Sequence, residues 1–89
     1  MHSFKQLQVW IKSMGLVKKI YLLTETFPKL EKFGLISQMQ RAVISVPTNI
    51  AEGSAKSSNR DFSRFLEIST DSLFELETLI IFSNRFELS

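Results

Sequence analysis

The stretch that decides the fold covers residues 35–54, which read LISQMQRAVISVPTNIAEGS. Its apolar residues recur at steps of three and four, as on one face of an α-helix; they are Leu35, Met39, Ala42, Val43, Val46, Ile50 and Ala51. Arg41 is the only charged residue between positions 35 and 51, and a helix exposed to solvent is rarely so neutral. We therefore expect a helix that other elements cover on more than one side.

Three residues near the end of this helix have predicted structural roles. Pro47 cannot donate a hydrogen bond to the carbonyl of Val43, and we predict a kink rather than a break because the apolar period continues past it. Asn49 is expected to hydrogen-bond the backbone group that the proline leaves free, a structural role that we favour over ligand binding. Gly53 is expected to end the helix.

A second helix is predicted over about residues 4–27. Ser3 and Gln6 form a capping-box pattern at its start, and Pro28 stops it because the residue before proline avoids the α conformation. Gly15 is expected to mark a close contact between helices. The apolar face is assigned to residues at helical spacing, namely Leu7, Trp10, Ile11, Met14, Val17, Tyr21 and Thr24.

A third helix is predicted over about residues 60–85, with Ser58 or Asn59 as its cap. One apolar face follows the helical period, and a second apolar strip lies near its C-terminal end; this strip comprises Ile68, Leu79, Ile81 and Phe82. Short loops make neighbouring helices antiparallel. The fold class is therefore an all-α, antiparallel up-down bundle of three helices in a single domain, residues 1–89.

Charged residues of the middle helix are expected to pair with the last helix. If the connection turns near residue 57, Arg41 faces Asp71 or Glu75. Glu52 would then face Arg60 or Arg64 at the other end of the hairpin. These pairs are predicted to be structural.

The charge is uneven along the chain. Residues 1–60 carry nine Lys/Arg and three Asp/Glu, whereas residues 61–89 carry two and six. One interpretation is that an acidic helix packs beside basic ones. The other is that the basic half presents a face to an anionic partner. Such a face is predicted on a stripe at seven-residue spacing with one neighbour, comprising Lys5, Lys12, Lys18 and Lys19.

No catalytic, cofactor or metal site is predicted. The chain has no cysteine, and its one histidine, His2, cannot form a triad or a metal cluster alone. No nucleotide-binding or hydrolase motif occurs, and no apolar stretch is long enough to span a membrane. We expect a cytoplasmic protein that is not an enzyme, has no small-molecule substrate and works by binding itself or other macromolecules.

The order of residues resembles a known family. The segment Ser-Val-Pro-Thr-Asn-Ile-Ala-Glu-Gly at residues 45–53 is its most specific part. The resemblance extends from Val9-Trp10 through Phe33-Gly34-Leu35 to Glu75-Leu76-Glu77 and so covers nearly the whole chain. The chain is similar to bacterial four-helix bundle proteins encoded in intervening sequences of 23S rRNA genes, which are related to accessory proteins of diversity-generating retroelements.

The resemblance implies a bundle that assembles as a homopentameric ring and has no enzymatic activity. Carried over onto this sequence, the matching positions imply fold and assembly rather than chemistry; they include Arg41, Pro47, Asn49, Glu52, Gly53 and Glu75. Family members continue into a fourth helix, and here residues 86–89 fall where the turn into it is expected. We therefore expect the fourth helix to be absent from this chain and self-association to cover the apolar strips.

Three hypotheses of function follow. The first is a non-catalytic, self-associating helical scaffold that binds rRNA or a ribonucleoprotein through the four lysines. The second is a purely structural oligomer whose partner is another protein. The third is a truncated gene product without function.

Overall fold

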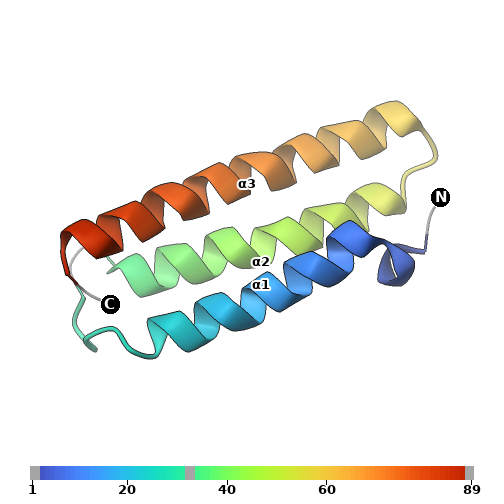
Figure 1. The fold of residues 1–89 in the computed structure, drawn as a ribbon. Coiled ribbons are helices and arrows are strands. Elements are labelled where there is room, and N and C mark those ends of the chain that lie inside the picture. Colours follow the sequence, from blue (N-terminus) through green and yellow to red (C-terminus); the bar gives the residue numbers. More distant parts are fainter. Residues whose placement is uncertain (1–2, 32–33, 88–89) are drawn as a thin grey trace.

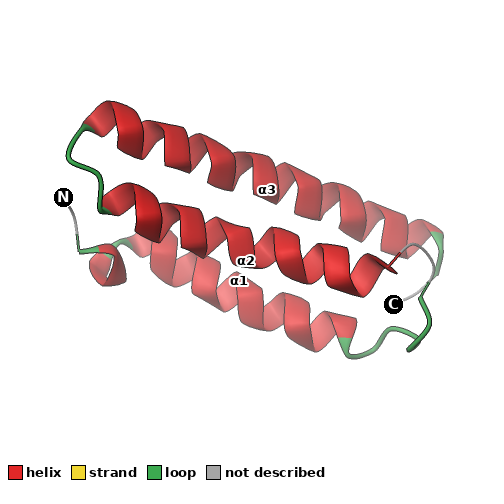
Figure 2. Cartoon of the chain, turned by 180° about the vertical axis from the view of Figure 1, so that it is seen from behind, coloured by secondary structure: helices red, strands yellow, loops and turns green. Residues whose placement is uncertain are grey.

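The computed structural model describes residues 3–31 and 34–87, and in these ranges it contains helices and no strand. A short 3-10 helix η1 (Phe4–Gln6) precedes the α-helices α1 (Gln8–Thr24), α2 (Leu35–Ser54) and α3 (Asn59–Arg85). The three long helices run side by side in a body of 44 × 19 × 15 Å (Figure 1). The predicted all-α bundle of three helices is confirmed, and the same arrangement is seen from behind in Figure 2.

Helix α2 forms the centre of the molecule. It packs against α1 on one side and α3 on the other, whereas α1 and α3 make no comparable backbone approach to each other. Its buried residues lie all along its length and are Leu35, Met39, Ala42, Val43, Val46, Pro47, Ile50, Gly53 and Ser54. This burial confirms the expectation, drawn from the lack of charge, that the middle helix is covered on more than one side.

The contact between α2 and α3 is tight and partly polar. Ser69 Oγ donates to the Val46 carbonyl oxygen at 2.9 Å, and Ser72 Oγ donates to Ser45 Oγ at 2.8 Å. Small side chains let two helices approach closely, and hydroxyl groups buried there need such partners. The antiparallel register predicted for this hairpin agrees with both pairs. Helix α2 also continues through Pro47 without a break, as predicted.

Two expectations about the end of α2 are wrong. The side-chain nitrogen of Asn49 donates to the carbonyl oxygen and to the hydroxyl of Ser45, at 2.8 and 2.9 Å, and not to the carbonyl of Val43. The helix ends at Ser54, in agreement with its predicted bounds, but Gly53 is itself helical and does not cap it. A Cβ at Gly53 would lie 2.6 Å from the Cβ of Phe65, so glycine is needed here for the close approach of α3.

The first helix begins later and ends earlier than predicted. Ser3 makes no side-chain cap, and Leu7 is extended, with φ −73° and ψ 126°, so that the 3-10 turn is separated from α1. This bend brings the Phe4 ring edge-on to Trp10, with ring centroids 5.1 Å apart. At the other end, α1 stops at Thr24, and Phe27 turns into the core and is buried.

The buried face of α1 also differs from the predicted one. The prediction places Ile11, Met14 and Tyr21 in the core, but all three are exposed. The residues that α1 buries are Ser13, Ile20 and Thr24, with Leu16, Val17 and Leu23 packed against the core cluster. The misassignment arises because apolar residues occur on nearly every side of α1, so spacing alone does not select the buried one.

Gly15 does not mark a close contact between helices, contrary to the prediction. It is exposed, and a Cβ built onto it would have nothing within 4 Å. Residues 3–31 and 34–87 therefore place no neighbour against this position of α1.

Helix α3 matches its predicted bounds closely. Ser58 caps it, because its Oγ accepts a hydrogen bond from the Asp61 backbone N–H at 3.1 Å. The core cluster between α2, α3 and α1 is formed by Ile20, Phe27, Leu35, Met39, Ala42, Val43, Leu76 and Leu79. All buried side-chain nitrogen and oxygen atoms among the described residues have hydrogen-bond partners. The fold therefore places α1 and α3 at the two outer edges of the bundle, around a core whose buried polar side-chain atoms are all hydrogen-bonded.

Candidate functional site

The candidate site is the basic surface of α1 and η1. Residues 1–24 contain four lysines and no Asp or Glu. Lys5, Lys12, Lys18 and Lys19 are all exposed, and none forms an ion pair with another described residue. Cations that have no carboxylate to neutralise them leave a positive potential for an anionic partner.

The lysines do not form one stripe as predicted. Lys5 lies in η1, and the extended residue Leu7 separates it from α1, so helical spacing does not relate Lys5 to Lys12. Lys12 and Lys19 are two turns apart within α1 and share a face. Lys18 precedes Lys19 by one residue and therefore points about 100° away. The basic surface thus wraps around α1 instead of following one line.

Lys12 borders a groove between α1 and α3. The groove is lined from α1 by Val9, Lys12, Ser13 and Leu16, from α2 by Val46 and from α3 by Leu73. Its floor is apolar, and Lys12 is the only charged side chain among these lining residues. The arrangement offers a cation beside an apolar surface, and the other polar side chain of the lining, Ser13, donates its hydroxyl hydrogen to the Trp10 carbonyl oxygen at 2.7 Å.

Helix α3 has the opposite charge pattern. Residues 65–84 contain four carboxylates and no Lys or Arg; the carboxylates are Glu67, Asp71, Glu75 and Glu77. All four side chains are exposed. The acidic charge of the C-terminal third is therefore displayed on the surface, and internal packing against the lysines of the same chain does not consume it.

The ion pairs predicted between α2 and α3 are absent from the described part of the structure. Arg41 is exposed and meets neither Asp71 nor Glu75, and Glu52 is exposed and meets neither Arg60 nor Arg64; no ion pair is found for any of them. The predicted register is sound, but register does not fix the rotation about the helix axis. Arg41, Thr48 and Glu52 recur at steps of seven and four, which places them together on the solvent face of α2.

Arg41 instead borders a surface groove on the side of α1. Tyr21, Lys29 and Glu31 line the same groove. The carboxylate of Glu31 accepts a hydrogen bond from the backbone N–H of Ile36 at 3.3 Å, near the start of α2. Gln40 links α2 to α1, because its side-chain nitrogen donates a hydrogen bond to Thr24 Oγ1 at 3.3 Å.

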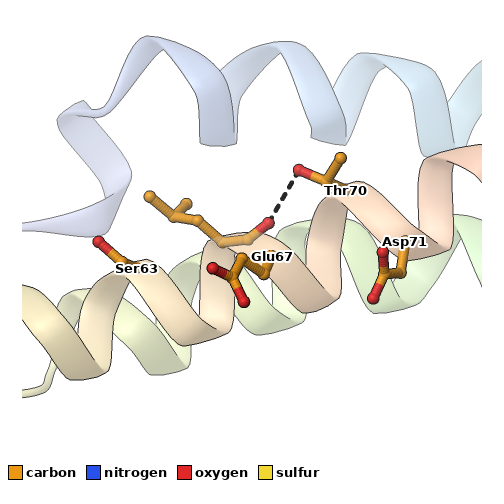
Figure 3. Close-up of a pocket in the computed structure, with 5 residues that line it drawn as sticks. Ser63, Glu67, Thr70 and Asp71 are labelled. Carbon is orange, nitrogen blue, oxygen red and sulfur yellow. Dashed lines mark hydrogen bonds between the residues drawn. The ribbon is translucent and has the colours of Figure 1, made fainter.

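The surface hollow shown in Figure 3 carries no catalytic arrangement. Ser63, Leu66, Glu67, Thr70 and Asp71 line it, all from α3. The Thr70 hydroxyl donates to the Leu66 carbonyl oxygen at 3.0 Å, so it is held by its own helix. Neither hydroxyl of this hollow has a histidine or lysine beside it among the lining residues, and a nucleophile needs a base within hydrogen-bond reach. The hollow is an open part of the α3 surface.

Residues 3–31 and 34–87 contain neither a metal cluster nor a membrane-spanning helix. No group of three or more His, Cys, Asp or Glu side chains there is placed to hold a metal ion. None of the helices described is long and apolar enough to cross a membrane. His2 lies outside the described residues.

Large apolar side chains are exposed on α1 and α3, and the sequence analysis predicted only some of them. On α1 they are Val9, Ile11, Met14, Tyr21 and Leu22, and on α3 they are Ile68, Leu73, Phe74, Ile81 and Phe82. Phe74 is 64% exposed and Leu22 is 54% exposed. The second apolar strip predicted on α3 correctly includes Ile68, Ile81 and Phe82, but Leu79 is buried. The prediction omits Phe74, although its spacing of seven from Ile81 puts the two on one face.

Comparison with known proteins gives one finding. Residues 5–89 match the model of a protein family described as 23S rRNA-intervening sequence protein. The match begins at the first lysine of the basic surface and includes all three α-helices. No curated protein matches the chain.

Proposed function

Since the chain belongs to the 23S rRNA-intervening sequence protein family, we propose that it is a non-catalytic helical scaffold that associates with copies of itself and binds RNA through the basic surface of α1. The RNA is structured RNA, such as rRNA or the RNA of a ribonucleoprotein. Assembly into a ring of five copies, which the family resemblance implies, is part of the proposal.

The observation that carries the RNA part is the absence of acidic residues from residues 1–24, where four exposed lysines occur. Phosphate groups of RNA are the anions that such a surface attracts with little regard to sequence. The groove beside Lys12 offers no donor or acceptor pattern that would select a base. Binding is therefore expected to depend on charge and RNA shape and to weaken strongly with salt.

The test compares RNA affinity of the full chain with that of the double variant Lys5→Glu/Lys12→Glu over a salt series. Fluorescence anisotropy with a labelled rRNA stem-loop is a suitable measurement. We expect the variant to bind at least about tenfold more weakly at low salt and to show a shallower salt dependence, because fewer counterions are released. Binding should weaken to a similar degree for unrelated stem-loops.

The matched control is Arg60→Glu/Arg64→Glu, which changes the net charge equally but at exposed positions near the start of α3. This control should keep most of the affinity. If both variants lose the same amount of RNA affinity, the effect comes from overall charge and not from the basic surface. If the unaltered chain does not bind RNA at low salt, the RNA part of the proposal is wrong.

A purely structural oligomer with a protein partner is the second candidate. The exposed apolar side chains on α1 and α3 favour it, since large apolar patches mark interaction sites in soluble proteins. It predicts association without RNA affinity. A product without function, the third hypothesis, predicts a broad thermal transition of low cooperativity for the isolated chain.

A further inference from the structure

The edges of the bundle carry opposite charges. Helices α1 and α3 lie on either side of α2, as both ribbon views show (Figures 1 and 2). The α1 edge comes from a segment with lysines and no acid, and the α3 edge from a segment with carboxylates and no base. Within one copy these edges do not pair, because no ion pair joins the α1 lysines to α3 among the described residues.

The α1 edge is defined by Ile11, Gly15, Lys18 and Leu22. These residues recur at steps of four, three and four and therefore share one exposed stripe of the helix. Ile11 is 46% exposed and Leu22 is 54% exposed. Lys19 lies directly beside this stripe.

The α3 edge is defined by Glu67, Asp71, Phe74, Thr78 and Ile81. The steps of four, three, four and three again place them on one exposed stripe. Phe74 and Ile81 give it an apolar centre, at 64% and 47% exposure, while two carboxylates supply negative charge at its N-terminal end. Within residues 11–22 and 67–81, each edge thus combines exposed apolar side chains with charges of one sign, and Arg64 and Arg85 lie beyond the two ends of the α3 edge.

We propose that a second copy of this chain occupies the α1 edge, with its own α3 edge packed against it. Charge selects this pairing, since α1 against α1 would bring lysines together and α3 against α3 would bring carboxylates together. Burial of Leu22, Phe74 and Ile81 supplies the apolar contribution. The inference rests on the self-association named in the proposed function and specifies which surfaces meet.

Gly15 provides an independent argument for the same contact. A glycine inside a helix costs stability, and no contact among the described residues explains this one, because nothing lies within 4 Å of the position that its Cβ would take. Gly15 lies between Ile11 and Lys18 on the α1 edge. A position without a side chain there accepts a bulky residue such as Phe74 of the second copy.

The pairing joins unlike surfaces, so it is heterologous. Each copy uses its α1 edge toward one neighbour and keeps its α3 edge for another, which leads to a closed ring or an open chain instead of a two-fold dimer. Lys12 is turned away from Lys18 toward the groove between α1 and α3. The contact therefore leaves the Lys12 side of α1 open to RNA.

The test is charge reversal followed by complementation, with sedimentation velocity of the RNA-free, full-length chain as the measurement. Lys18→Glu/Lys19→Glu makes the α1 edge acidic, and Glu67→Lys/Asp71→Lys makes the α3 edge basic. Each variant alone then opposes like charges, and we expect its self-association to weaken at least about tenfold. All four positions are exposed, so helical content by circular dichroism should not change.

Mixing the two variants in equal amounts restores unlike charges at every mixed contact. Because a ring of five cannot alternate two kinds of copy throughout, the mixture should form larger assemblies than either variant alone without matching the unaltered ring. The fourfold variant, which carries all the changes and has the original net charge, should sediment as the unaltered assembly does. Assemblies unaffected by either reversal, or reduced assemblies that mixing does not enlarge, would overturn the contact while leaving self-association itself in place. If the unaltered chain is a monomer, both the proposed contact and self-association are wrong. RNA binding is tested separately by its own salt series.

Discussion

At the scale of single residues, the two helical glycines have opposite environments. Gly53 is buried against Phe62 and Phe65 of α3, where a Cβ would approach within 2.6 Å of another, whereas the Cβ position at Gly15 is open. Gly53→Ala should lower the free energy of unfolding by about 1–3 kcal/mol through overpacking. Gly15→Ala should raise it by about 0.5–1 kcal/mol, since alanine loses less entropy in a helix.

Urea denaturation followed by circular dichroism measures both changes, at a protein concentration low enough that association does not contribute. The two variants control for each other because both replace a helical glycine by alanine. Destabilisation of similar size in both would contradict the environments described. Sequence reasoning identified these glycines as special, but it placed the close helix contact at Gly15 instead of Gly53, because the closeness of a neighbouring helix depends on how both helices are rotated.

At the scale of elements, the bounds of α2 and α3 followed from sequence because apolar period, caps and short loops all agreed. The start of α1 did not, since the turn of Phe4 onto Trp10 depends on a ring contact that a capping pattern does not reveal. The buried face of α1 was also misassigned, as was the side of α2 that bears Arg41. A helical period gives a face, but only the packed neighbours decide which face is buried.

The α2–α3 contact gives a prediction at this scale. Ser72→Ala removes the hydrogen bond to Ser45 Oγ and should lower the free energy of unfolding by about 0.5–1.5 kcal/mol. Ser63→Ala is the matched control, because Ser63 is an exposed serine of the same helix. That control reports the gain in helix propensity alone and should be neutral or slightly stabilising. Thermal and urea denaturation check the pair, and equal behaviour of the two would show that the serine contact contributes nothing to stability.

At the scale of the whole molecule, the uneven charge and the excess of apolar surface are visible in the sequence, but their arrangement is not. The structure separates basic and acidic segments onto helices on either side of α2 and leaves large apolar side chains exposed on both. Neither edge is explained by contacts within one copy. Family membership agrees with a fold of this kind, and the proposed assembly and RNA binding account for the two surfaces.

The most direct measurement is sedimentation velocity of the unaltered 89-residue chain, free of RNA, from low to high micromolar concentration in moderate salt. Self-association predicts a species larger than the 10.3 kDa monomer, whose fraction rises with protein concentration and falls as salt weakens the charged contact. A single 10.3 kDa species over the whole range would contradict the central claim that this chain acts as a self-associating scaffold.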